Sequence, residues 1–135
     1  MEATMRTVVL LALIILFFPG CSYYHPSNED VVDTHGEITN LEKILKFVEN
    51  VNQGEEDNIR IVRYTTEGDP ILNDLEYDGE MITSTTDTTR DEFGVGSVNT
   101  KICKTIDVKE TAENTDYTLS GCDLNSDNSI LVIWN

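Results

Sequence analysis

The chain has 135 residues, of which 25 are acidic and 9 are basic, and its formal net charge at pH 7 is -16. Basic residues are outnumbered almost three to one and form no cluster, which excludes a protein that binds nucleic acid through its phosphates. The length allows one domain. Apolar residues are concentrated at the amino terminus, so the rest of the chain can build only a thin core.

The amino terminus has the pattern of a secretion signal. An arginine precedes eleven unbroken apolar residues, a run too short to cross the hydrocarbon core as a helix. The run is followed by Gly20-Cys21, and a small residue before a cysteine resembles a bacterial lipobox. We expect residues 1–20 to be a lipoprotein signal peptide and Cys21 to carry a diacylglycerol, which anchors the chain on the extracellular face of the cell membrane. The alternative is an ordinary signal or an uncleaved anchor that is followed by a cysteine.

A tether and a helix are expected next. Residues 21–36 contain a proline, several charges and little periodicity, which is typical of a flexible tether. Apolar residues then recur at three- and four-residue spacing over residues 41–51, which predicts an amphipathic helix. Either Thr39 or Asn40 is suited to cap its start, and Gly54 is suited to end it in a left-handed conformation.

The rest of the chain has the composition of strands and turns. The pair Asp78-Gly79 favours a two-residue hairpin turn, which would set Leu75 opposite Ile82. We therefore expect an α+β domain over residues 37–135, with one N-terminal amphipathic helix packed on an antiparallel meander of about five to six strands. The expected strands cover residues 58–66, 71–77, 80–88, 98–108, 115–122 and 129–134.

The three cysteines support the lipobox and predict a disulfide. A hairpin centred between residues 112 and 113 would place Cys103 directly opposite Cys122, and an exported chain is in an oxidising setting. With lipid on Cys21, no cysteine is left unpaired. Closing this loop should contribute about 3 kcal/mol of stability. The alternative, a metal site with two reduced cysteines, is disfavoured because no C-x-x-C motif accompanies them.

Candidate sites for chemistry are weak. Both histidines fall in or beside the expected tether, so we expect no enzyme built on a Ser-His or Cys-His pair. Asp123, Asn125 and Asp127 alternate like the ligands of a calcium loop, but the closing glutamate position of such loops holds Trp134. We favour a polar turn here, with weak calcium binding as the alternative, and expect no other cofactor.

The segment over residues 87–96 joins charged residues to an aromatic one in an expected surface loop. Arg90, Asp91 and Phe93 are candidates for recognition of a partner. The favoured alternative is structural: Arg90 pairs with Asp87 or Asp91, and Phe93 caps the sheet.

Residues 35–79, residues 87–96 and the two later cysteines together resemble a family of small Gram-positive, Bacillus-type lipoproteins that carry a domain of unknown function. The resemblance implies lipid anchoring but no activity. From the charge we expect a non-enzymatic extracellular domain that binds or inhibits a cationic protein or binds a cell-envelope component. The alternatives are a calcium-stabilised structural module and a carboxylate-based envelope hydrolase.

Overall fold

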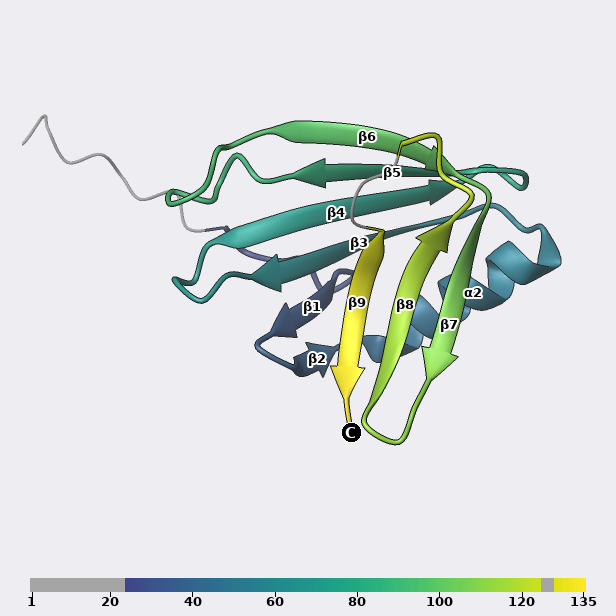
Figure 1. Cartoon of the computed structure of the whole chain (residues 1–135), viewed down its shortest axis with the longest axis horizontal. Coiled ribbons are helices and arrows are strands. Elements are labelled where there is room, and N and C mark those ends of the chain that lie inside the picture. Colours follow the sequence, from purple (N-terminus) through teal and green to yellow (C-terminus); the bar gives the residue numbers. More distant parts are fainter. Residues whose placement is uncertain (1–23, 125–127) are drawn as a thin grey trace, which may run out of the picture.

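The computed structural model describes residues 24–124 and 128–135, which form nine strands and one helix (Figure 1). The six-stranded first sheet has the order β2-β1-β3-β4-β5-β6, and the second sheet has the order β7-β8-β9. Only the pair β1 and β3 is parallel among the described strands. The elements are β1 (Val31–Thr34), β2 (Glu37–Thr39), α2 (Leu41–Gln53), β3 (Asp57–Tyr64), β4 (Pro70–Tyr77), β5 (Ile82–Asp87), β6 (Val98–Cys103), β7 (Thr105–Glu110), β8 (Asn114–Ser120) and β9 (Ser129–Trp134).

The expected fold class, an α+β domain with a helix on one antiparallel meander, is wrong, because the protein is mostly β with two separate sheets. The strand predicted over residues 98–108 is interrupted at Lys104, where the chain leaves the first sheet as β6 and enters the second as β7. No glycine or proline marks this break in the sequence. β-Branched residues stand on both sides of Lys104, so the sequence pattern predicts one strand and does not reveal the division into two sheets.

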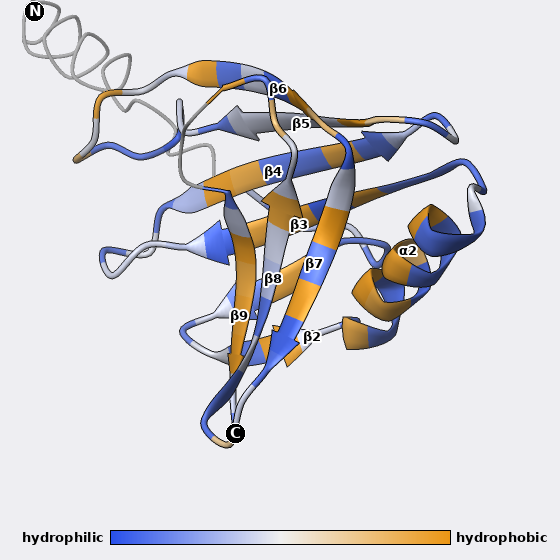
Figure 2. Cartoon of the chain, turned by 45° about the vertical axis from the view of Figure 1, so that its right-hand side comes forward, coloured by the Kyte–Doolittle hydropathy of each residue, from blue (hydrophilic) through white to orange (hydrophobic). Residues whose placement is uncertain are grey.

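The core lies between one face of the first sheet and the layer formed by the second sheet and α2. Strands β7 to β9 cross the strands of the first sheet steeply (Figure 1), as in orthogonal sheet packing. Apolar segments of both sheets and of the helix can be followed in Figure 2. The largest fully buried side chains include Ile44, Phe47, Ile61, Leu75, Ile82, Leu119, Ile130 and Leu131.

The helix covers the residues whose periodicity indicates it. Ile44, Phe47 and Val51 form its buried face, and Gly54 ends it with φ 73° while its N–H donates to the Val51 carbonyl. Asn40 stands at the N-cap position but makes no side-chain cap bond. Its amide instead donates to the backbone oxygen of Asp30 at 2.7 Å, which ties the segment before β1 to the start of the helix.

Strand β1 occupies residues 31–34 of the segment expected to be a tether, and β2 begins directly after that segment, so the tether predicted over residues 21–36 does not extend to residue 36. Asp30 is buried and accepts hydrogen bonds from the Ser27 backbone N–H at 2.9 Å and the Ser27 hydroxyl at 2.8 Å. His35 and Gly36 both have positive φ, as a tight hairpin turn requires. These local bonds order the segment although its apolar content is low.

The hairpin of β4 and β5 has a different register from the predicted one. Tyr77 faces Ile82, and Leu75 faces Ser84 instead of Ile82. The Asp78 carboxylate accepts the backbone N–H groups of Glu80 at 2.9 Å and Met81 at 2.7 Å. These bonds favour a four-residue connection over the two-residue turn, and the shift of two residues leaves each side chain on its expected face.

A disulfide joins Cys103 and Cys122, the pair that the hairpin register predicts. In the β7–β8 hairpin Thr105 faces Ser120. Two residues before Thr105 and two residues after Ser120, the same spacing sets Cys103 opposite Cys122. Because Cys103 ends β6 and Cys122 follows β8, the bond lies where the chain passes between the sheets. It therefore links the two layers of the core.

Candidate functional site

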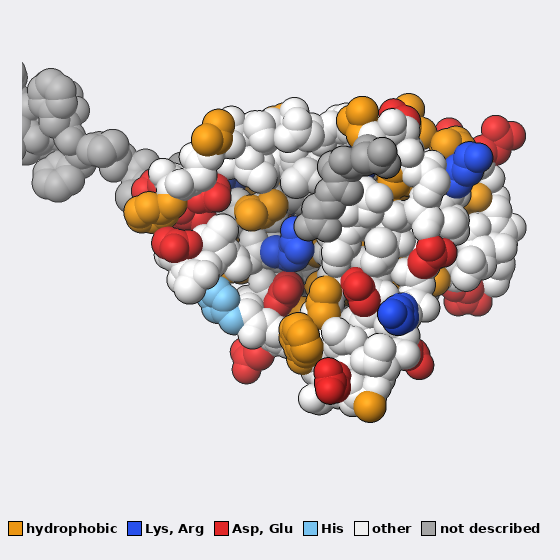
Figure 3. All heavy atoms as spheres, in the orientation of Figure 1, with side chains coloured by type: hydrophobic (Ala, Val, Ile, Leu, Met, Phe, Trp, Pro, Cys, Tyr) orange, Lys and Arg blue, Asp and Glu red, His pale blue; other side chains and the backbone are white. Residues whose placement is uncertain are grey.

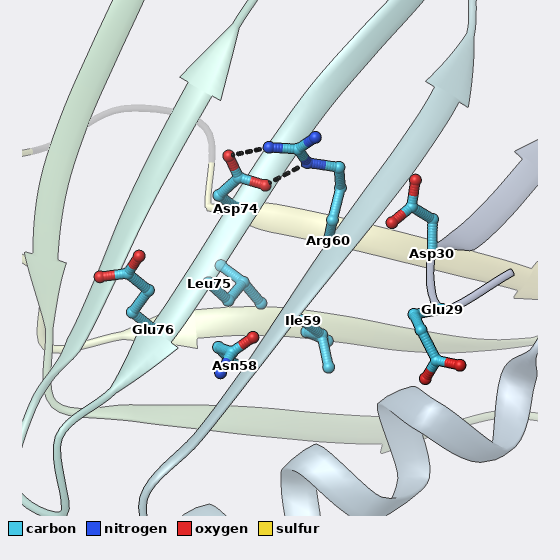
Figure 4. A pocket seen from close by; sticks show the side chains of 8 residues that line it. All are labelled: Glu29, Asp30, Asn58, Ile59, Arg60, Asp74, Leu75 and Glu76. Atoms are coloured by element: carbon cyan, nitrogen blue, oxygen red, sulfur yellow. Dashed lines mark hydrogen bonds and ion pairs between the residues drawn. The ribbon is translucent and has the colours of Figure 1, made fainter. Parts of the chain in front are cut away.

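Strands β3 and β4 carry an acidic depression on the surface. Its first part is a cavity of about 280 Å³ (Figure 4). Glu29 and Asp30 enter it from the segment before β1, and Glu76 enters it from β4. The full lining is Glu29, Asp30, Asn58, Ile59, Arg60, Asp74, Leu75 and Glu76.

Arg60 and Asp74 form the ion pair of this cavity. They face each other across β3 and β4, and the guanidinium donates to both carboxylate oxygens, at 2.6 and 2.8 Å (Figure 4). The Asp74 carboxylate raises the pKa of Arg60, and a third contact at 3.4 Å reaches the Tyr24 hydroxyl. The guanidinium of Arg60 is therefore already bonded to Asp74 and Tyr24, and the Asp74 carboxylate neutralises its charge within the cavity.

The second part is a wider hollow of about 610 Å³ at the start of β3 and the end of β4. It shares Asn58 and Glu76 with the first part, so the two lie next to each other. Its lining is Glu56, Asp57, Asn58, Glu76, Tyr77, Asp78 and Thr83. We call the two parts together the acidic cleft. It contains seven carboxylates and one cation, which are Glu29, Asp30, Glu56, Asp57, Asp74, Glu76, Asp78 and Arg60.

The carboxylates of the cleft differ in their bonding. Asp57 accepts the Asn50 amide at 2.8 Å, and backbone N–H groups of the β4–β5 turn hold the pKa of Asp78 below its usual range. Within the part of the chain that the structure describes, the carboxylates of Glu56 and Glu76 have no hydrogen bond or ion pair. These two exposed groups are therefore available to a cationic partner.

None of the cleft residues was predicted as a site from the sequence. They come from several segments, and the pairing of β1 with β3 and of β3 with β4 brings them together. One available signal was the alternation of Asp74, Glu76 and Asp78, since every second residue of a strand points to the same face.

The predicted recognition residues lie in the loop between β5 and β6. Arg90 pairs with Asp87 at 2.7 Å and stacks on the Tyr24 ring at 5.4 Å. Asp91 accepts the backbone N–H groups of Phe93 and Gly94 at 3.1 and 3.0 Å. The expected pairing of Arg90 with Asp87 is therefore present. Phe93, however, is 76 % exposed and does not cap the sheet.

The calcium-loop pattern is described only in part, because Asn125 and Asp127 lie outside the described residues. Asp123 accepts the Ile102 backbone N–H at 2.9 Å, which fastens the segment after β8 to the edge of β6. The side-chain oxygen of Asn128 accepts a hydrogen bond from the Lys101 ammonium at 2.8 Å. The described residues contain no group of three side chains that could hold a metal ion, and the calcium site stays a prediction.

The expected signal peptide, residues 1–20, and the lipidation site Cys21 also lie outside the described residues. Among residues 24–124 and 128–135, no helix has the length and apolar character needed to cross a membrane.

Comparison with known proteins gives a family but no activity. The domain of unknown function DUF4362 matches residues 28–118, a range that begins before β1 and ends within β8. No curated protein and no solved structure matches the chain. Since the match covers most of the chain, the protein belongs to the DUF4362 family, whose domain is of unknown function.

Proposed function

We propose that this protein is a membrane-anchored extracellular lipoprotein whose domain binds a cationic protein or a cationic cell-envelope component and catalyses no reaction. The acidic cleft carries the proposal, because it gathers seven carboxylates around a single arginine that is already paired. A partner that presents lysine or arginine side chains would find acceptors in Glu56 and Glu76 without breaking an existing bond.

The lipid anchor is the second part of the proposal. It rests on the lipobox-like Gly20-Cys21 pair and on the resemblance to Gram-positive lipoproteins. The disulfide between Cys103 and Cys122 supports it as well, because this bond leaves Cys21 as the one cysteine for lipidation. Labelling with radioactive palmitate should mark the wild type and not Cys21→Ala. Persistent labelling of that variant would contradict the anchor.

The charge of the whole domain adds to the attraction. Asp and Glu side chains outnumber Lys and Arg side chains on the face drawn in Figure 3, in keeping with the net charge of -16. Such a field accelerates encounter with a cationic partner and is screened over about 8 Å at physiological salt. Binding should therefore weaken as the salt concentration rises.

Lysozyme serves as the cationic probe in a binding measurement at low and high salt. The double variant Glu56→Gln with Glu76→Gln should weaken binding about threefold or more, since each charged contact at an interface rim contributes up to about 1 kcal/mol. Neither side chain is bonded within the described residues, so the fold should not change.

The matched control is Glu110→Gln with Glu113→Gln, which removes the same charge near the β7–β8 turn. We expect this control to bind the probe almost as tightly as the wild type, because it lowers the negative charge of the domain but leaves the cleft unchanged. Equal weakening by both double variants would show that net charge alone attracts the probe. Absence of salt-sensitive binding would contradict the proposal itself.

A further inference from the structure

The loop between β5 and β6, residues 88–97, exposes two apolar side chains. Phe93 is 76 % exposed and Val95 is 94 % exposed. Figure 3, in the orientation of Figure 1, shows hydrophobic side chains beside acidic ones at the end of the molecule where this loop lies. Exposed aromatic and aliphatic side chains at one loop tip are typical of a contact surface.

The loop is held open by its own hydrogen bonds. Asp91 accepts two N–H groups inside the loop, and Asp69 of the β3–β4 connection accepts the Glu92 N–H at 2.9 Å. At its base, Thr88 and Ser97 exchange backbone and side-chain bonds. Phe93 and Val95 are thus presented by a braced backbone. The same bonds engage Asp69 and Asp91, and Asp87 is paired with Arg90, so much of the negative charge at the loop is locally compensated.

The described chain begins beside this loop. The Arg90 guanidinium lies over the Tyr24 ring at 5.4 Å, and the Tyr24 hydroxyl contacts Asp30 at 3.3 Å and Arg60 at 3.4 Å. Tyr24 is therefore fixed to the domain. Cys21 precedes it by three residues, which span at most about 11 Å when fully extended.

We propose that the β5–β6 loop contacts the lipid bilayer, with Phe93 and Val95 inserted into its interfacial region. The inference rests on the lipid anchor of the proposed function. An anchor on Cys21 keeps Tyr24 within about 11 Å of Cys21. The stacking of Arg90 on the Tyr24 ring then places the loop next to Tyr24, in the zone beside the lipid headgroups. A Phe and a Val side chain in that zone leave water for an apolar environment.

The contact also fixes how the domain stands on the membrane. The loop follows the end of β5, where Asp87 faces Leu72 near the start of β4, whereas the second part of the acidic cleft lies at the opposite end of β4. From Leu72 to Tyr77 the strand advances five residues, which separates the two by about 17 Å at about 3.3 Å per residue. The second part of the cleft, which contains Glu56, then lies on the side away from the bilayer, where a partner can reach it, whereas the first part lies beside Tyr24.

The test uses the mature chain, residues 21–135, coupled through Cys21 to a maleimide-bearing lipid in phosphatidylcholine vesicles with brominated acyl chains. Cys103 and Cys122 are joined, so coupling occurs at Cys21 whether or not a cell lipidates it. The probe is Phe93→Trp in a Trp134→Phe background. Bromine should quench Trp fluorescence at position 93 about twofold or more, as expected for an aromatic ring at the interface.

The matched control is Leu45→Trp in the same background, because Leu45 is an exposed apolar residue of α2, which lies at the other end of the molecule (Figure 1). Quenching at position 93 that clearly exceeds quenching at position 45 supports the proposal. Equal quenching at the two positions, whether strong or absent, overturns it and leaves the loop free for a protein. Palmitate labelling tests the cellular anchor separately, so its failure is distinguishable from failure of the loop contact.

Discussion

Replacing both Cys103 and Cys122 by alanine should lower the free energy of unfolding by about 3 to 4 kcal/mol. The two residues are 19 apart in the sequence, and closing a loop of this size removes about 3 kcal/mol of chain entropy from the unfolded state. Cys103 is fully buried and belongs to the core cluster, so loss of its sulfur removes some packing as well. The total is a large fraction of the 5 to 15 kcal/mol that is typical of single domains.

Urea unfolding of a form that lacks the first 21 residues measures this loss, with circular dichroism as the signal. A reducing agent should destabilise the wild type by a similar amount and leave the double alanine variant unchanged, which separates the crosslink from the side chains. A loss below about 1 kcal/mol would refute the reasoning. It would mean that the pairing of β7 with β8 restrains the chain equally well without the bond.

Three further substitutions test single features of the fold. Gly54→Ala should cost about 1 kcal/mol in chemical unfolding, because Gly54 has φ 73° and the added methyl group has room, so only backbone strain changes. Asp78→Ala should be less stable than wild type at neutral pH. Since the folded state depresses the pKa of Asp78, this difference should begin to shrink as the pH falls below about 4 and vanish only below the depressed folded-state pKa, and a constant difference would contradict it. Asp123→Ala should lower the melting temperature by about 2 to 4 °C equally in about 5 mM calcium and in chelator, because Asp123 holds the Ile102 N–H; a loss seen only with calcium would establish a metal site.

The predictable parts of the fold are those specified by local periodicity. The helix follows from apolar spacing and the glycine that ends it, and the pairing of Cys103 with Cys122 follows from the centre of the β7–β8 hairpin. Strands β1 and β2 were missed because they are short and partly polar. They depend on a parallel partner, β3, and on the distant contact of Asn40 with Asp30, neither of which a local pattern reveals.

The acidic cleft could not be predicted for a similar reason. Its members are ordinary surface carboxylates in the sequence, and they become a site only when β3 and β4 pair with Arg60 opposite Asp74. The loop residues, in contrast, were found from composition because a charged segment that contains a phenylalanine is unusual on a surface. Their structural role was only partly foreseen, since Arg90 pairs as expected but Phe93 remains exposed.

The two ends of the first sheet differ in the side chains that they expose. One end carries the braced loop with Phe93 and Val95 beside Tyr24, and the other carries the open part of the acidic cleft. A bilayer with anionic headgroups repels the cleft and accommodates the apolar loop, so both forces favour the same orientation. Neither force needs a long tether, because Tyr24 is already bonded to the domain three residues after the proposed anchor site. In the proposed orientation, the net charge of -16 favours a position in which the open part of the acidic cleft faces away from the membrane and toward cationic partners.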